Sequence, residues 1–188
     1  MLCTSPTCQS AWTDRCRSRA WLFGTTVCPV ALSGVQAVDI RRAGSRDLLA
    51  LLTLRASWRE TAVTDDYAVD FDAWFHREGN QRWWWLAEDP AGVAVGMVNM
   101  KIFDRMPVPG GSSGRWGYLA NLFVEPSYRN GGVGARLIAA LMATSRDEGL
   151  ARVVLSPSEQ SKPLYRRAGF LPVDVLLVWQ PPSQSKHM

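Results

Sequence analysis

Residues 121–135, NLFVEPSYRNGGVGA, join a β-prone run to the start of an amphipathic helix. A proline turn and three glycines lie between the two elements, and Arg129 stands within the turn. Glycines let the backbone approach phosphate oxygens, and the free N–H groups of a first helical turn attract negative charge. Arg129 can add charge-assisted hydrogen bonds. The segment therefore predicts a strand-turn-helix site for a diphosphate.

Two other phosphate-binding loops do not fit this segment. A Walker A loop ends in Gly-Lys-Ser/Thr, whereas Gly134 is followed by Ala135 and Arg136. A dinucleotide-binding fingerprint needs G-x-G-x-x-G and an acidic residue about 20 positions further on, and the spacing here does not supply them. ATP hydrolysis and dinucleotide binding are therefore not indicated.

Strand-like and helical patterns alternate on both sides of the loop. The expected strands are 38–41, 83–87, 93–103, 118–124, 152–155 and 170–179. The expected helices are 45–57, a region around 67–75 that stops at Gly79, 134–148 and 161–168. The order β-α-α-β-β-β-α-β-α-β predicts an α/β (α+β) domain.

Two details of the strands bear on a site. Alternation along strand 83–87 places Trp84 on the opposite face from Trp83 and Trp85, so these rings are divided between the core and a possible aromatic wall for a substrate. Gly96, inside strand 93–103, indicates a bulge, a close backbone approach or simple tolerance.

Composition suits one globular domain and excludes several classes. The 188 residues are 47% hydrophobic and 20% charged, and the net charge of +4 is too weak to indicate nucleic-acid binding. No apolar run approaches the roughly 20 residues of a membrane span. All four cysteines lie before residue 30 without paired C-x-x-C spacing, so no metal site is expected.

The chain divides into three predicted parts. Residues 1–34 imitate a signal peptide imperfectly, and we interpret them as a dispensable extension of a cytoplasmic protein. Residues 35–180 form the predicted domain, and 181–188 are a tail.

Two motifs in this order resemble the GNAT superfamily of acetyl-coenzyme A-dependent N-acetyltransferases. Residues 129–134, RNGGVG, are similar to the family's Arg/Gln-x-x-Gly-x-Gly/Ala after Val-x-Pro, and 163–170, PLYRRAGF, to its Leu-Tyr-x-x-x-Gly-Phe. The resemblance extends over about 35–179. It implies a central mixed, mostly antiparallel sheet flanked by helices, and transfer of acetyl from acetyl-CoA to a primary amine of a small molecule, peptide or protein, with a homodimer possible.

The resemblance also implies roles for individual residues. Tyr165 would protonate the departing thiolate, since a phenol can give a proton. Phe123 and Val124 would contact the acetyl and pantetheine portions with their backbone. The complete cofactor-binding set implied is Leu122, Phe123, Val124, Arg129, Asn130, Gly131, Gly132, Val133, Gly134, Ala135 and Ser158.

The chain departs from the family pattern at the general base. Many members carry a Glu on the strand before Val-x-Pro, where this chain has 119–122, LANL. Deprotonation of the amine would then use water, Glu125 or Glu60. The missing carboxylate also motivates an alternative, a non-catalytic acyl-CoA-binding sensor or interaction module. Ser158 stands where members often have an Asn.

Overall fold

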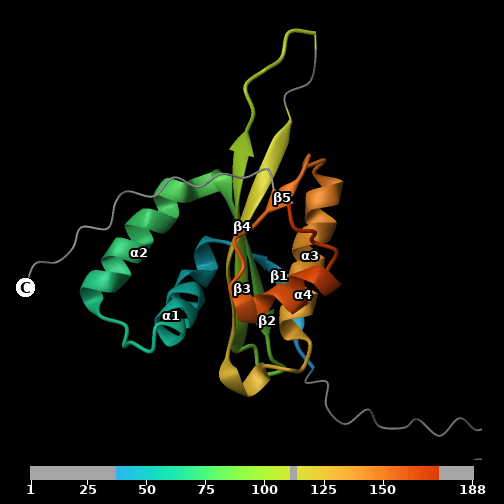
Figure 1. The fold of residues 1–188 in the computed structure, drawn as a ribbon. Helices are drawn as coiled ribbons and strands as arrows, with labels where there is room; N and C mark the ends of the chain where they lie inside the picture. Colours follow the sequence, from blue (N-terminus) through green and yellow to red (C-terminus); the bar gives the residue numbers. More distant parts are fainter. Residues whose placement is uncertain (1–36, 111–113, 174–188) are drawn as a thin grey trace, which may run out of the picture. The chain divides into compact units, whose positions relative to one another are not determined.

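A five-stranded sheet forms the centre of the part that the computed structural model describes, residues 37–110 and 114–173. The strands lie side by side in chain order (Figure 1). They are β1 (Asp39–Ala43), β2 (Arg82–Glu88), β3 (Ala94–Asp104), β4 (Arg115–Val124) and β5 (Val153–Val154). Each pair of neighbours is antiparallel except β4 and β5, which are parallel. The predicted mixed, mostly antiparallel sheet is confirmed.

Helices cover both faces of this sheet (Figure 1). On one face, α1 (Leu48–Trp58) and α2 (Asp65–Glu78) share a core cluster with Trp84, Leu86 and Met97. On the other, α3 (Val133–Asp147) and α4 (Lys162–Arg167) pack on Trp85, Val98 and Met100. No helix in the described ranges is long and apolar enough to cross a membrane.

Local sequence accounts for the ends of α2. The hydroxyl of Thr64 accepts a hydrogen bond from the N–H of Tyr67 at 3.3 Å, which caps the first turn. Acidic side chains in that turn and basic ones in the last complement the helix dipole. Gly79, with φ of 45°, ends the helix where the sequence predicts a stop.

The first nine predicted elements occur in the expected order, although their ends shift by a few residues. The sixth expected strand, 170–179, is different: residues 170–173 are irregular, and 174–179 lie outside the described residues. The proposed extension 1–34 and tail 181–188 also lie outside them. Both remain predictions.

The two strand details are resolved. Trp84 packs in the cluster under α1 and α2, whereas Trp85 packs on the α3 face, as alternation predicts. Gly96 marks a close approach, because a Cβ there would lie 3.1 Å from the carbonyl oxygen of Phe123. The register of β2 and β3 shifts beside it, between Ala87 and Glu88.

Gly117 on β4 lies directly against the Met100 side chain, and we expect Gly117→Ala to destabilise the fold. A Cβ there would lie 2.8 Å from Cγ of Met100 and closer still to its sulfur, and Met100 is fully buried. Overpacking of this kind costs about 1–3 kcal/mol, to be measured by urea denaturation. Gly114→Ala is the control, since its Cβ would have neighbours at 3.7 and 3.9 Å. Equal stability of the two variants would contradict the prediction.

Candidate active site

The edge of β4 that faces β5 is paired over only part of its length. Gly117 pairs with Val153 and Tyr118 with Val154, after which β4 continues to Val124 without a β5 partner in the described chain. The carbonyl of Phe123 points toward β3, as its approach to Gly96 shows. The backbone groups of successive residues alternate in direction along a strand, so the N–H and carbonyl groups of Leu122 and Val124 point to the unpaired edge. The carbonyl of Phe123, whose backbone the resemblance implies as a cofactor contact, faces β3 instead.

A bulge interrupts β4 within this unpaired stretch. Between the pairs Asn99–Ala120 and Met97–Phe123, β4 contains one residue more than β3. Asn121 occupies the bulge with φ of 55°, a left-handed conformation that Asn tolerates better than most residues. The bulge turns the Asn121 side chain to the α1/α2 side, where it lines a pocket.

Beyond β4, the glycine loop opens α3 as predicted. Gly132 is the N-cap of α3 with φ of 81°, and a Cβ there would have no described heavy atom within 4 Å. No side chain caps the helix among the residues that the structure describes, and the first turn, 133–136, contains no acid. The N–H of Arg136 donates to the carbonyl of Gly132 at 3.0 Å, and the N–H groups before it have no described capping side chain at the positive end of the helix dipole, next to the open space beside Gly132. A diphosphate fits this arrangement.

Two hydrogen bonds hold the loop before α3. The N–H of Glu125 donates to the carbonyl of Val95 at 2.9 Å, and the Tyr128 hydroxyl donates to the Asp89 carboxylate at 2.9 Å. That carboxylate raises the pKa of Tyr128. These hydrogen bonds connect the loop to β3, through Val95, and to the turn between β2 and β3, through Asp89.

Arg129 lies along the end of β4. Its Nε donates to the carbonyl of Val124 at 2.9 Å, and its guanidinium carbon is 5.7 Å from the centre of the Phe123 ring. The side chain is thus beside both the glycine loop and the unpaired strand edge. This placement suits the predicted diphosphate contact.

Tyr165 lies on the β5 side. It is 8% exposed, its ring meets Phe170 edge-on at 5.7 Å, and it lines a hollow of about 340 Å³ beside β5. Burial raises the pKa of its phenol, which therefore stays protonated at neutral pH. Ser158 is exposed and its hydroxyl donates to that of Ser161 at 3.0 Å.

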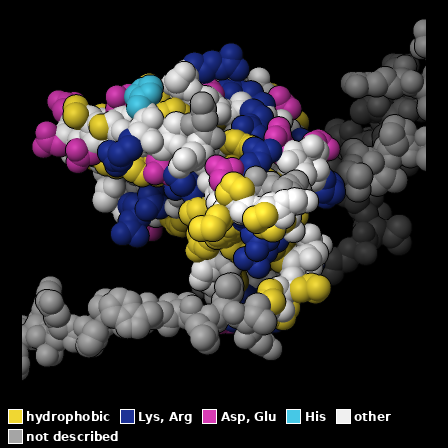
Figure 2. Space-filling model, turned by 90° about the horizontal axis from the view of Figure 1, so that it is seen from above, with side chains coloured by type: hydrophobic (Ala, Val, Ile, Leu, Met, Phe, Trp, Pro, Cys, Tyr) yellow, Lys and Arg dark blue, Asp and Glu magenta, His cyan; other side chains and the backbone are white. Residues whose placement is uncertain are grey.

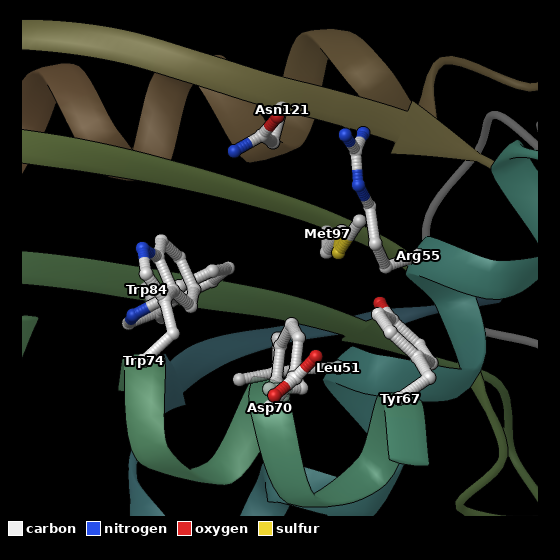
Figure 3. A pocket seen from close by; sticks show the side chains of 9 residues that line it. Leu51, Arg55, Tyr67, Asp70, Trp74, Trp84, Met97 and Asn121 are labelled. Carbon is white, nitrogen blue, oxygen red and sulfur yellow. The ribbon is translucent and has the colours of Figure 1, made fainter. Parts of the chain in front are cut away.

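A second pocket, of about 400 Å³, lies on the opposite side of β4, between the sheet, α1 and α2 (Figure 3). Its apolar lining consists of Leu51, Phe71, Trp74, Trp84 and Met97. Its polar lining consists of Arg55, Tyr67, Asp70 and Asn121. We call it the α1/α2 pocket. Its volume lies within the range of small-molecule sites, about 300–1,000 Å³.

A row of stacked side chains connects this pocket with the glycine loop. The Arg55 guanidinium carbon lies 4.8 Å above the Trp58 ring, and Trp58 stacks on Phe123 at 5.8 Å with an angle of 17°. Arg129 lies over the same Phe123 ring. Cation–π contacts and stacking hold Arg55 at the pocket wall.

Sequence reasoning missed Arg55, Tyr67 and Asp70 as site residues. The available signal was helical spacing: Arg55 is four residues after Leu51, and Asp70 is three after Tyr67, so each shares a helix face with an apolar neighbour. Glu60 and Glu125, the carboxylates considered from sequence, are not among the lining residues of the α1/α2 pocket, whereas Asp70 is.

Charged patches and clusters of metal-ligating side chains would be signs of another kind of site. On the face in Figure 2, acidic and basic side chains of the described residues are interspersed, without a continuous basic stripe. Within the described ranges, no group of three or more His, Cys, Asp or Glu is arranged to hold a metal ion. His76 is exposed and pairs with Asp72 at 3.4 Å.

Comparisons with known proteins agree with this geometry. The chain matches the acetyltransferase (GNAT) family over residues 48–170. It is 36% identical over 85 residues to glucosamine 6-phosphate N-acetyltransferase of Trypanosoma brucei brucei, covering 45% of this chain and 56% of the relative. It is 40% identical over 103 residues to mycothiol acetyltransferase of Salinispora tropica, covering 53% of this chain and 31% of the relative. The chain thus spans about half of one curated relative and a third of the other.

A solved structure extends the comparison to the fold. The crystal structure of a predicted acetyltransferase with acetyl-CoA from Clostridium acetobutylicum superimposes with a TM-score of 0.63 at 21% identity, covering 77% of this chain and 96% of that one. The family match spans well over half of the chain, and the glycine loop, the bulged β4 and the α3 N-terminus all lie within it. The protein belongs to the GNAT acetyltransferase family.

Proposed function

We propose that the protein is an N-acetyltransferase that moves an acetyl group from acetyl-CoA to a primary amine. One observation carries the proposal: the unpaired stretch of β4 contains the Asn121 bulge, which faces the α1/α2 pocket, and leads through the glycine loop to an α3 N-terminus that no described side chain caps. A donor held by the loop and an acceptor in the pocket would meet at this strand. The two curated relatives are both named acetyltransferases, which supports the same reaction.

The donor would be held mostly by backbone groups. The N–H groups of the first turn of α3, together with Arg129, would bind the diphosphate. Backbone N–H groups of Leu122 and Val124 at the unpaired edge would hold the pantetheine and acetyl portions, and one could stabilise charge on the carbonyl oxygen. Bound acetyl-CoA supplies a thioester, whose C–S bond breaks as the amine nitrogen bonds to the acetyl carbon.

Two proton transfers remain for side chains. Tyr165 is proposed as the acid that protonates the thiolate, and its buried, protonated phenol suits that role. Asp70 is proposed to take the amine proton, directly or through water, because it is the carboxylate among the described residues that line the α1/α2 pocket. This assignment replaces the Glu60 and Glu125 alternatives.

We expect Asp70→Asn to lower kcat/KM for an amine acceptor by about 10²-fold, because an amide cannot accept the proton. The affinity for acetyl-CoA should not change, since Asp70 is not at the glycine loop. Steady-state thiol release and calorimetry measure the two quantities. Asp66→Asn, on the same helix and outside the pocket lining, is the matched control. Equal rates for the two variants would exclude Asp70.

The overall proposal is tested by calorimetry with acetyl-CoA and then by thiol release with a panel of amines, with the acetylated product identified by mass spectrometry. We expect binding and turnover. Binding without turnover for any amine would favour the non-catalytic acyl-CoA module. Absence of binding would contradict both.

A further inference from the structure

The polar groups of the α1/α2 pocket stand at two sides of an aromatic chamber. Figure 3 shows the Arg55 guanidinium and the Asn121 side chain on the side nearer β4, and Asp70 and Tyr67 projecting from α2. The rings of Trp74 and Trp84 lie between β2 and α2, with centroids 5.8 Å apart and planes nearly perpendicular. The pocket thus offers charge at its edges and apolar surface within.

Arg55 is a fixed cation available to a ligand. It takes part in none of the ion pairs formed by the described residues. Its stacking on Trp58, itself stacked on Phe123, holds the guanidinium in place without using its N–H donors. A guanidinium with free donors is suited to a planar carboxylate.

The phenol of Tyr67 is a second donor in this pocket. Its hydroxyl is buried and has no hydrogen-bond partner among the described residues, an arrangement that costs free energy unless a ligand completes it. Burial raises the pKa of Tyr67, and the positive charge of Arg55 opposes that rise. The Arg55 guanidinium is therefore close enough to interact electrostatically with the phenol. Arg55 and Tyr67 are thus two donors without a hydrogen-bond or ion-pair partner among the described residues, and together they suit an oxyanion.

Charge balance restricts the ligand further. Arg55 and Asp70 give the lining a net charge of zero, and Asp70 also forms no ion pair with described residues. A pocket lined by one positive and one negative side chain matches a zwitterion better than a dianion such as a phosphate monoester. Trp74, Trp84 and Phe71 would bury an apolar or aromatic body.

We propose that the acceptor is a small zwitterionic amine with an apolar body, that is, an apolar or aromatic α-amino acid whose carboxylate is held by Arg55 and Tyr67. The inference rests on the proposed acetyl transfer and adds the acceptor class to it. The primary amine would lie between Asp70 on α2 and the unpaired edge of β4. Asp70 would attract the ammonium form before its proton is lost.

The test compares acceptors that differ in one group. Thiol release from acetyl-CoA is measured with phenylalanine, phenylalaninamide, phenethylamine, glutamate and glucosamine 6-phosphate. We expect kcat/KM for phenylalanine to exceed that for its amide by about 10- to 100-fold, the effect of one charge-assisted site. Glutamate, with a second carboxylate near Asp70, and glucosamine 6-phosphate, a dianion without an apolar body, should both react more slowly than phenylalanine.

Variants assign the preference to residues. Arg55→Gln should bring the ratio of phenylalanine to phenylalaninamide close to 1, and Tyr67→Phe should lower it by a smaller factor, about 5-fold. The intrinsic reactivities of the two amines cancel when the phenylalanine-to-phenylalaninamide ratio of kcat/KM is compared between the wild type and a variant. Arg59→Gln, one residue beyond α1 and outside the pocket lining, is the matched control and should keep the wild-type ratio.

The outcomes separate this inference from the proposed function. Turnover of phenethylamine or glucosamine 6-phosphate at or above the rate of phenylalanine would overturn the acceptor class and leave acetyl transfer standing. An unchanged ratio in Arg55→Gln would also overturn it. No turnover with any amine would instead reject the proposed function. If Arg55→Gln does not fold, the wild-type panel and Tyr67→Phe decide the question.

Discussion

We expect Gly132→Asp to abolish acetyl-CoA binding while the protein remains folded. Gly132 has φ of 81°, a conformation that Asp and Asn adopt more readily than other side chains, and space surrounds its Cβ position. An Asp at this N-cap would place negative charge beside the first turn of α3, where the diphosphate should bind. The attraction between the carboxylate and the helix dipole offsets part of the strain that a side chain has at this φ, so we expect a folded protein with at most a small fall in melting temperature.

Two variants separate charge from backbone strain. Gly132→Asn has nearly the same shape and the same backbone strain without the charge, and we expect it to weaken binding by a smaller factor. Gly149→Asn replaces a glycine with φ of 65° after the other end of α3 and should leave binding unchanged. Calorimetry gives the dissociation constants. Wild-type affinity in Gly132→Asp would show that the donor is not held at this helix.

Tyr165→Phe is expected to lower kcat by about 10²-fold or more, with little change in acetyl-CoA affinity, because it removes only the hydroxyl that would protonate the thiolate. The ring would still pack against Phe170 beside β5. Single-turnover and steady-state rates with one amine, and calorimetry with acetyl-CoA, measure the two effects. Leu164→Met, a change of similar volume at the neighbouring position of α4, is the control.

The pH dependence gives an independent check on Tyr165. Burial raises the pKa of its phenol above the usual value of about 10, so the acid form is present throughout the neutral range and is lost only as the pH rises through that higher value. Ionisation of Tyr165 should therefore cause no decline of the wild-type rate below about pH 10. Below that pH, the rate profiles of the wild type and of Tyr165→Phe should have the same shape. A near-wild-type rate in the variant would remove Tyr165 from the mechanism.

The glycine loop could be predicted from sequence because its determinants are local. Glycines at 131, 132 and 134 and an amphipathic run after them specify a loop followed by a helix, wherever the segment lies in the fold. Alternation in β2 likewise separates Trp84 from Trp83 and Trp85, since side-chain direction follows from the pleat. These short-range rules were sufficient for the fold class and for the glycine loop that opens α3.

The α1/α2 pocket could not be predicted in the same way. Arg55, Tyr67 and Asn121 are separated by 12 and 54 positions in the chain and come from two helices and a strand. Their proximity depends on how α1 and α2 pack against the sheet and on one extra residue in β4, which turns Asn121 toward them. A bulge depends on the register with a partner strand, which a pattern within one segment does not contain.

By itself, then, the sequence determined the order of the first nine elements, the family and the loop suited to a diphosphate, because hydrophobic periodicity and glycine conformations act over a few residues. Only the tertiary structure decided which part of the β4 edge is unpaired, that Asp70 and not Glu60 or Glu125 lines the α1/α2 pocket, and that Arg55 and Tyr67 have no hydrogen-bond partner there among the described residues. The physical reason is that these properties arise from packing between distant segments, where the geometry of the whole sheet and its helices sets each contact.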